Sequence, residues 1–219
     1  MYYKNFKSEN IDVVLEKQEP YKNYDKSTST MSLLYNAQLD FAHIPFSEGW
    51  LKVEQEKINE ISKLNIFDTN KKKIGIFYRG NTSVMPNRHI DLKELMPIFN
   101  LDKYLFYSLD IEKKDENEIK FFNDNNIIDC SKYINDFYDT AAIIKNLDLV
   151  ITIDSSIVHL AGALSVDTYL LIPYSSEWRW FEDTKITPWY NSVTLFKQKI
   201  PADWKSVVND VLEILNKKE

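Results

Sequence analysis

Short apolar runs alternate with amphipathic segments over most of this chain. The runs are rich in branched and aromatic side chains and lack a polar face, which is typical of parallel strands covered on both sides. They predict strands at residues 73–78, 104–108, 127–129, 149–153, 168–172 and 193–196. Helical spacing between them predicts helices at residues 50–64, 91–99, 112–125, 140–147, 157–164 and 202–217. This alternation predicts an α/β fold with a doubly wound parallel sheet.

The stretch from residue 147 to 164 is the most informative unit of the pattern. An apolar strand ends at Asp154, Ser155 and Ser156, and a helix follows. These three residue types are good N-caps, and the backbone N–H groups of a first helical turn favour an anion such as phosphate. The alternative is that the three polar residues only cap their own helix.

The amino-terminal segment does not follow the alternation. One branched run, residues 11–15, leads into a polar stretch at residues 16–30 that contains Pro20. A single strand has no partner in its own neighbourhood and must pair with the main sheet, with another chain or not at all. We therefore divide the chain into a strand and linker at residues 1–30 and one domain at residues 31–219.

Composition narrows the classes of protein. The chain has 219 residues, of which 44% are hydrophobic, enough for one good-sized core. Its formal charge of −6 argues against a nucleic-acid surface. The single cysteine, Cys130, excludes an internal disulfide framework and favours a reducing, cytoplasmic location. We find no metal-ligand spacing of histidines, no leader and no apolar run long enough to span a bilayer, so we expect no metal and no membrane span.

Polar side chains follow the first two predicted strands. Arg79, Asn81 and Arg88 lie in the loop after the first strand, where the arginines could fork onto a phosphate. Gly80 allows a close backbone approach or a positive φ. Ser108 and Asp110 end the second strand and could meet a base or a ribose. The alternative is a plain turn with solvated arginines.

Two further candidates follow the fourth and fifth strands. His159 lies one turn into the helix after Asp154 and could donate to an anion, although a lone helical histidine is more often a packed residue. Within the aromatic segment 173–191, Trp178 could stack on a sugar or base and Arg179 could hold a charge. For Trp180 and Trp189 we favour a satellite core that pins this segment onto the last helix. No Walker, GxGxxG or Ser-His-acid signature is present, so these residues alone name no reaction.

Several motifs in order carry a family resemblance. Residues 31–219 resemble the carboxyl-terminal part of bacterial tetratricopeptide-repeat glycosyltransferases, which are similar to the ADP-heptosyltransferases of glycosyltransferase family nine. His89 departs from the pattern, because that group has serine there. The segments that carry the resemblance are residues 74–81, 87–90, 136–142, 147–164, 171–181, 187–190 and 195–198.

The resemblance implies a GT-B fold, in which the carboxyl-terminal Rossmann-like domain holds a nucleotide-diphosphate sugar. It implies an inverting, metal-independent transferase without a cofactor. It also implies that the diphosphate-sugar lies at residues 154–156 and His159, the phosphates near Arg79, Asn81 and Arg88, and the nucleoside near residues 108–110.

The repeats and the amino-terminal Rossmann domain of these relatives have no counterpart in this sequence, and residues 11–20 resemble the tail of that domain. We therefore expect a glycosyltransferase-type domain that binds the sugar donor, transfers to an unknown acceptor and needs a partner domain, which supplies the catalytic base. The alternatives are a non-catalytic interaction or scaffold module, docking or self-associating through the unpaired strand or the aromatic segment, and a degenerate half-enzyme. A nucleotide-sugar epimerase is a more distant alternative.

Overall fold

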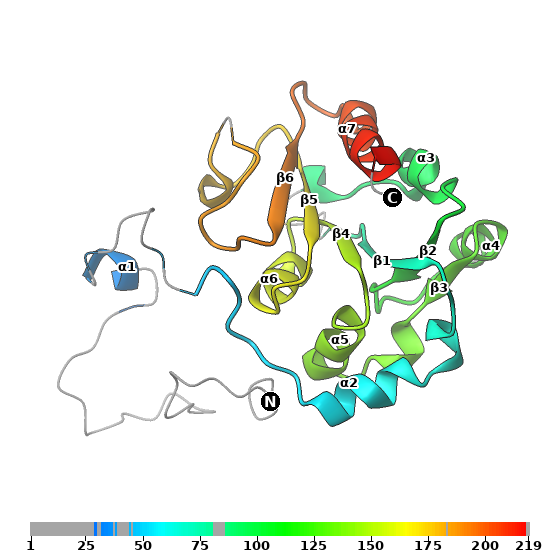
Figure 1. Ribbon diagram of the computed structural model, residues 1–219. Coiled ribbons are helices and arrows are strands. Elements are labelled where there is room, and N and C mark those ends of the chain that lie inside the picture. Colours follow the sequence, from blue (N-terminus) through cyan, green and yellow to red (C-terminus); the bar gives the residue numbers. More distant parts are fainter. Residues whose placement is uncertain are drawn as a thin grey trace.

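One parallel sheet organises the molecule (Figure 1). The computed structural model describes residues 29, 32–36, 38, 44, 46–80, 86–182 and 184–217. The sheet has six strands in the order β3-β2-β1-β4-β5-β6, and every pairing is parallel. The strands are β1 (Lys72–Phe77), β2 (Tyr104–Ser108), β3 (Ile127–Asp129), β4 (Leu149–Ile153), β5 (Thr168–Ile172) and β6 (Val193–Lys197). The predicted doubly wound α/β fold is confirmed.

The strand order reverses at β1, which pairs with β2 on one side and β4 on the other. Ile76 of β1 lies opposite Ser108 of β2 and Ile151 of β4. The segments that follow β1 and β4 pack on opposite faces of the sheet, which marks the carboxyl ends of these two strands as its switch point. This is the place where ligands bind in open parallel sheets.

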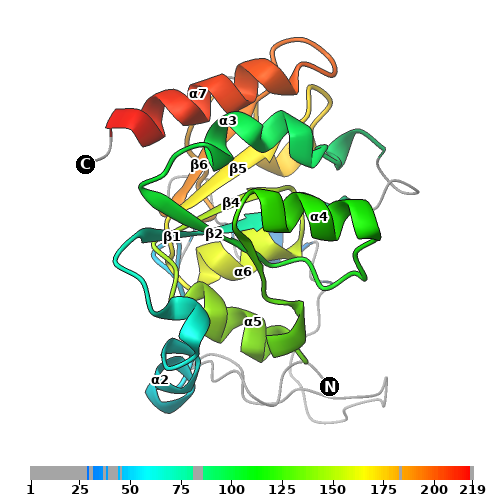
Figure 2. The same cartoon turned by 90° about the vertical axis from the view of Figure 1, so that its right-hand side faces the viewer.

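Helices cover both faces of the sheet, as Figure 2 shows. Helices α2 (Gln55–Ser62), α5 (Phe137–Ile144) and α6 (Ser156–Ala163) pack on one face, around a core that includes Ala141, Ile144 and Leu160. Helices α3 (Met96–Phe99), α4 (Glu116–Asp124) and α7 (Trp204–Lys217) pack on the other, around Phe99, Phe122 and Val208. The remaining helices are α1 (Leu33–Asn36), η3 (Asn65–Phe67), η4 (Pro86–Arg88), η5 (Leu92–Leu95), η6 (Ser131–Tyr133) and η7 (Trp178–Trp180).

Polar caps begin the helices at the carboxyl edge of the sheet. Asp136 caps α5, since its side chain accepts from the N–H groups of Tyr138 and Asp139 at 2.8 and 2.9 Å. Asp115 and Glu118 form a capping box at α4. Each cap fixes the point at which the preceding loop enters the helix, so the residues of that loop are held beside the strand ends.

The predicted helix at residues 50–64 is wrong in its first turn. The N–H groups of Trp50 and Leu51 donate to the carbonyl of Ala163, at 2.8 and 2.9 Å. These two residues are therefore tied to the end of α6 in a non-helical conformation, and α2 begins only at Gln55. The apolar stripe of this segment continues through both conformations, which is why its spacing suggested one longer helix.

The aromatic segment after β5 forms the predicted satellite core, but on different elements. Trp180 is fully buried and clusters with Val158 of α6, Leu170 of β5 and Leu195 of β6. The segment is thus pinned onto α6 and the edge of the sheet, whereas we expected the last helix. Trp189 packs against the same cluster and is partly buried.

The predicted strand at residues 11–15 and the proposed boundary near residue 30 cannot be compared with the fold, because residues 1–28, 30 and 31 lie outside the described residues. Among the helices that the structure describes, none combines the length and the apolar character needed to cross a membrane.

Candidate functional site

Loops that follow three different strands meet at Arg88. Ile90 N–H donates to the carbonyl of Tyr78 at 3.2 Å, which places residues 88–90 beside the end of β1. Gly80 allows the backbone at His89 to approach closely, since a Cβ at position 80 would lie 3.0 Å from the backbone nitrogen of His89. Arg88 is thereby placed beside the end of β4. Its Nη2 lies 3.1 Å from Asp154 Oδ2, and its Nη1 donates to the Asp154 carbonyl at 3.4 Å.

Glu177 joins Arg88 to a second arginine. Its Oε1 accepts from Arg88 Nη2 at 2.5 Å, and its Oε2 lies 2.6 Å from Arg179 Nη2. The side chains of Arg88 and Arg179 keep 20% and 35% of their surface exposed, whereas the Asp154 side chain keeps only 5%. The result is a partly open pair of guanidinium groups anchored by a buried carboxylate.

His159 extends this cluster along the first turns of α6. Its ring stacks on Trp180, with centroids 5.5 Å apart, and its Nδ1 lies 3.1 Å from the Tyr190 hydroxyl. Arg179 Nη1 approaches His159 Nε2 at 3.5 Å. Because a guanidinium can only donate, Nε2 accepts, so Nδ1 carries the proton and donates to Tyr190. Burial, together with the charge of Arg179, lowers the pKa of His159, and the ring is neutral at physiological pH.

The start of α6 lies directly beside these groups. Ser155 is the N-cap, and its hydroxyl accepts from Ile157 N–H at 3.2 Å. Ser155 therefore does cap its own helix. Ser156 is exposed as the first residue of the helix. Through Asp154 and Glu177, the two arginines are held near the positive end of the helix, which favours an anion there.

Arg79 belongs to a second cluster, at the end of β2. Its Nε donates to Asp110 Oδ2 at 2.8 Å, and its Nη2 pairs with Glu118 of α4. Asp110 is 1% exposed and also accepts from Glu112 N–H at 3.0 Å. Ser108 is equally buried, with its hydroxyl 3.4 Å from Asp110 N–H. Two carboxylates balance Arg79, so this cluster orders the loop between β2 and α4.

Lys114 reinforces the same loop from within. It is only 7% exposed, its ammonium donates to the carbonyls of Asp110 and Glu112, and it lies 3.3 Å from Asp129 Oδ1. A buried lysine with carbonyl and carboxylate partners holds the ends of β2 and β3 together.

Trp178 is the exposed aromatic side chain nearest in sequence to the arginine cluster. It retains 61% of its surface and meets Trp189 edge to face, with centroids 6.4 Å apart. Trp189 in turn donates from its indole nitrogen to the carbonyl of Arg179 at 2.8 Å. Trp189 thus holds the backbone of Arg179, and most of the Trp178 side chain remains open to solvent.

No protein-family model matches the chain, and no curated protein matches it. Solved structures do. ADP-heptose LPS heptosyltransferase II of E. coli is 13% identical with a TM-score of 0.51, and the match covers 77% of this chain and 55% of that one. A family 9 glycosyltransferase from Veillonella parvula is 14% identical with a TM-score of 0.54, covering 78% and 53%. The single α/β Rossmann-like sheet of this chain matches one part of each of these glycosyltransferases.

At this identity the likeness shows a shared Rossmann-like fold, and the chain spans about half the length of these two glycosyltransferases. The comparisons agree with the predicted relation to heptosyltransferases and family nine at the level of the fold. They give no support to the tetratricopeptide-repeat part of the resemblance.

The glycosyltransferase-like fold thus brings part of the predicted site together. Arg88, Asp154, His159 and Arg179 form one connected cluster, with Ser155 and Ser156 at its border. Arg79, Ser108 and Asp110 form the other cluster, and Asn81 lies outside the described residues.

Three residues that hold these clusters together had no role predicted from the sequence. Glu177 bridges Arg88 and Arg179, the Tyr190 hydroxyl accepts a hydrogen bond from His159 Nδ1, and Glu118 pairs with Arg79. For Glu177, a signal was present, because it adjoins Trp178 and Arg179 in the aromatic segment. Glu118 gave none, since it lies in a helix whose other charges are solvated.

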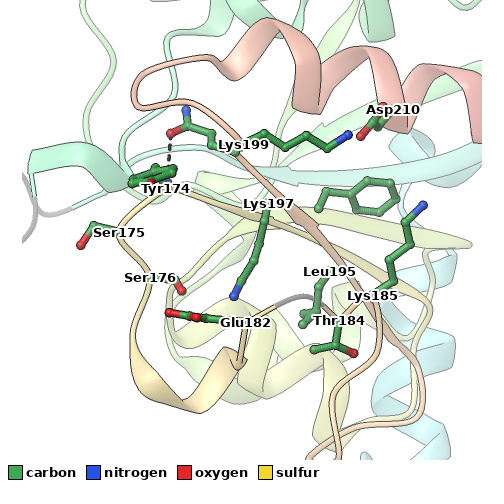
Figure 3. Close-up of a pocket in the computed structure, with 12 residues that line it drawn as sticks. Tyr174, Ser175, Ser176, Glu182, Thr184, Lys185, Leu195, Lys197, Lys199 and Asp210 are labelled. Atoms are coloured by element: carbon green, nitrogen blue, oxygen red, sulfur yellow. Dashed lines mark hydrogen bonds between the residues drawn. The ribbon is translucent and has the colours of Figure 1, made fainter.

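A cavity of about 920 Å³ opens on the β6 side of the aromatic segment (Figure 3). Ser175 and Ser176 lie at one side of it and Lys185 at the other. None of the predicted site residues lines it. Among the residues that the structure describes, no group of three or more His, Cys, Asp or Glu side chains is arranged to hold a metal ion.

Proposed function

We propose that this chain is a glycosyltransferase-type domain that binds a nucleotide-diphosphate sugar in the crevice between β1 and β4. The observation that carries the proposal is the convergence of Arg88, Arg179 and the start of α6 at this point. Two guanidinium groups beside a helix N-terminus match the charge and the donor geometry that a diphosphate requires.

The proposed roles follow from the contacts of each residue. Arg88 and Arg179 bind the phosphates, and Asp154 positions Arg88, since its buried carboxylate would repel the ligand if it were left unpaired. His159 accepts from Arg179 and donates to Tyr190, so it positions Arg179 without adding a fixed charge to the site. The loop ordered by Arg79 and Asp110 receives the nucleoside, and Trp178 stacks on a ring of the ligand.

Sugar transfer breaks the bond between the anomeric carbon and the diphosphate, so negative charge builds up on the leaving group. The two arginines and the start of α6 stabilise that charge electrostatically, which is why we propose a metal-independent reaction. We assign the acceptor site and the base that removes the acceptor proton to a partner domain, and we propose inversion at the anomeric carbon. The half-length match to the two glycosyltransferases supports this division of labour.

The test is a calorimetric titration of the full chain with UDP, ADP and GDP and with one sugar conjugate of each. We expect saturable binding of one nucleotide. Arg88→Gln should weaken it by about 2 kcal/mol, roughly thirtyfold, because a charge-assisted contact to phosphate is lost.

Lys120→Gln is the matched control for this titration. It removes one positive charge from an exposed helix position, 73% exposed in its side chain, and should leave affinity unchanged. If none of the six ligands binds, the proposal of a donor site is rejected and a scaffold function gains support.

A further inference from the structure

The carboxylate of Glu177 lies where two guanidinium groups converge. Its two oxygens contact Arg88 and Arg179 separately, at 2.5 and 2.6 Å. Two oxygens on one planar carbon, each facing its own arginine, resemble the way in which one phosphate group engages two arginines. The protein therefore places its own anion in the position that best suits a ligand anion.

The neighbouring contacts would keep the arginines in place if this carboxylate moved. Arg88 is also held by the buried Asp154, at 3.1 Å. The backbone of Arg179 is held by Trp189, and the adjacent Trp180 is fully buried. Only the side chain of Glu177 has to rotate away for the two guanidinium groups to become available.

Within the part of the chain that the structure describes, the Glu177 side chain forms hydrogen bonds and ion pairs with Arg88 and Arg179 alone. Glu177 is the N-cap residue of η7, yet its side chain makes no capping hydrogen bond. The residues before it, Tyr174 and Ser175, are exposed. Rotation of this side chain therefore breaks two ion pairs and leaves the short helix unchanged.

Rotation of the Glu177 side chain changes the net charge of the cluster. Arg88 and Arg179 carry two positive charges, Asp154 and Glu177 carry two negative charges, and His159 is neutral. A phosphate approaching the complete cluster meets no net positive charge, whereas the cluster without the Glu177 carboxylate is positive. An anion can bind both arginines only by displacing this carboxylate.

We propose that Glu177 is an internal counterion that competes with the ligand phosphate for Arg88 and Arg179. This inference rests on the proposed function, because it concerns the same anion site. The competition lowers the affinity for the donor and for the departing nucleotide diphosphate. It also prevents ligands without a strong negative charge from occupying the two arginines.

The test is a titration of inorganic pyrophosphate into the full chain, compared with Glu177→Gln and Glu177→Ala. We expect both variants to bind pyrophosphate about tenfold more tightly than the original chain, because the competing charge is gone. Glu182→Gln is the matched control, since it removes the same charge from an exposed position in the same segment and should change nothing. Thermal unfolding of each variant verifies that it is folded.

Equal or weaker pyrophosphate binding by the folded Glu177 variants overturns the inference, because the carboxylate is then neutral toward the ligand or part of its binding set. Failure of every variant to bind pyrophosphate overturns it as well. The proposed function fails separately. If the Glu177 variants gain affinity for pyrophosphate but no nucleotide binds more tightly than pyrophosphate, the counterion stands and the nucleotide-sugar assignment falls.

Discussion

At the scale of single residues, His159 links the candidate site to protein stability. Its ring is largely buried against Trp180 and Tyr190, and the nearby charges are those of Arg88, Asp154, Glu177 and Arg179. Burial and Arg179 place its pKa in the folded protein below the ordinary value of 6.5. The unfolded chain therefore takes up this proton at a higher pH than the folded protein does.

We predict that part of the stability is lost as the pH falls from 6.5 toward the lower pKa of His159 in the folded state. The urea concentration at the unfolding midpoint of the original chain should decrease as the pH is lowered from 7.5 to 5.5. In His159→Gln, which has no proton to gain there, the decrease should be smaller. The same pH dependence in both proteins would show that the ring is accessible and that its neighbours do not oppose protonation.

At the scale of elements, the packing of α6 against the segment after β5 determines where His159 and Arg179 meet. Gly162 of α6 lies under the ring of Tyr190, since a Cβ at Gly162 would come within 2.4 Å of Tyr190 Cγ. Tyr190 also receives the hydrogen bond from His159. One small residue thus decides how closely the aromatic segment approaches the helix.

We predict that Gly162→Ala destabilises the protein by about 1–3 kcal/mol, because overpacking at this contact outweighs the roughly 1 kcal/mol by which alanine favours a helix over glycine. Urea unfolding measures the change. Adding Tyr190→Ala should remove the clash, so that alanine at position 162 then stabilises that background. A stabilising Gly162→Ala in the original chain would show that the two elements are not in this contact.

At the scale of the whole molecule, the only cysteine of the sequence reports on the integrity of the fold. Cys130 has no exposed surface, and it lies in the core beneath α5. Burial raises the pKa of its thiol to about 12, so the reactive thiolate is scarce at neutral pH.

We predict that Cys130 does not react with a disulfide reagent such as DTNB in native buffer and reacts fully in denaturant. The labelling rate at intermediate urea should follow the unfolding transition, because opening of the core exposes the thiol. Rapid labelling in native buffer would indicate that the ends of β2 and β3 open without global unfolding.

Local sequence was sufficient to predict the bounds of four of the six strands. The strands at residues 104–108, 127–129, 149–153 and 168–172 were predicted with the bounds that the structure has. The strands β4 and β5 are buried at every position, so a continuous apolar run is the direct consequence of their place in the sheet. The edge strand β3 is only partly buried. The helix after Ser155 begins within about one residue of its predicted start, whereas the helix after Asp136 begins at Phe137, about one turn before the predicted Thr140.

Errors arose where a contact distant in sequence overrides the local pattern. Trp50 and Leu51 continue an apolar stripe but are held by the carbonyl of Ala163, more than a hundred residues later in the chain. The burial of Trp180 was predicted, yet its partners on α6, β5 and β6 were not. Periodicity records that a side chain is buried and carries no information about which element covers it.

The sequence by itself determined that this chain forms a parallel α/β sheet and that polar and basic residues follow its strands, because strand burial and turn chemistry are local properties. Only the tertiary structure decided which of these residues meet. The order of strands brings the residues that follow β1, β4 and β5 together, so that Glu177 joins Arg88 to Arg179. Arg79 instead pairs with Asp110 in a separate cluster. Charge pairing depends on distances between loops, and those distances are set by the packing of the whole sheet.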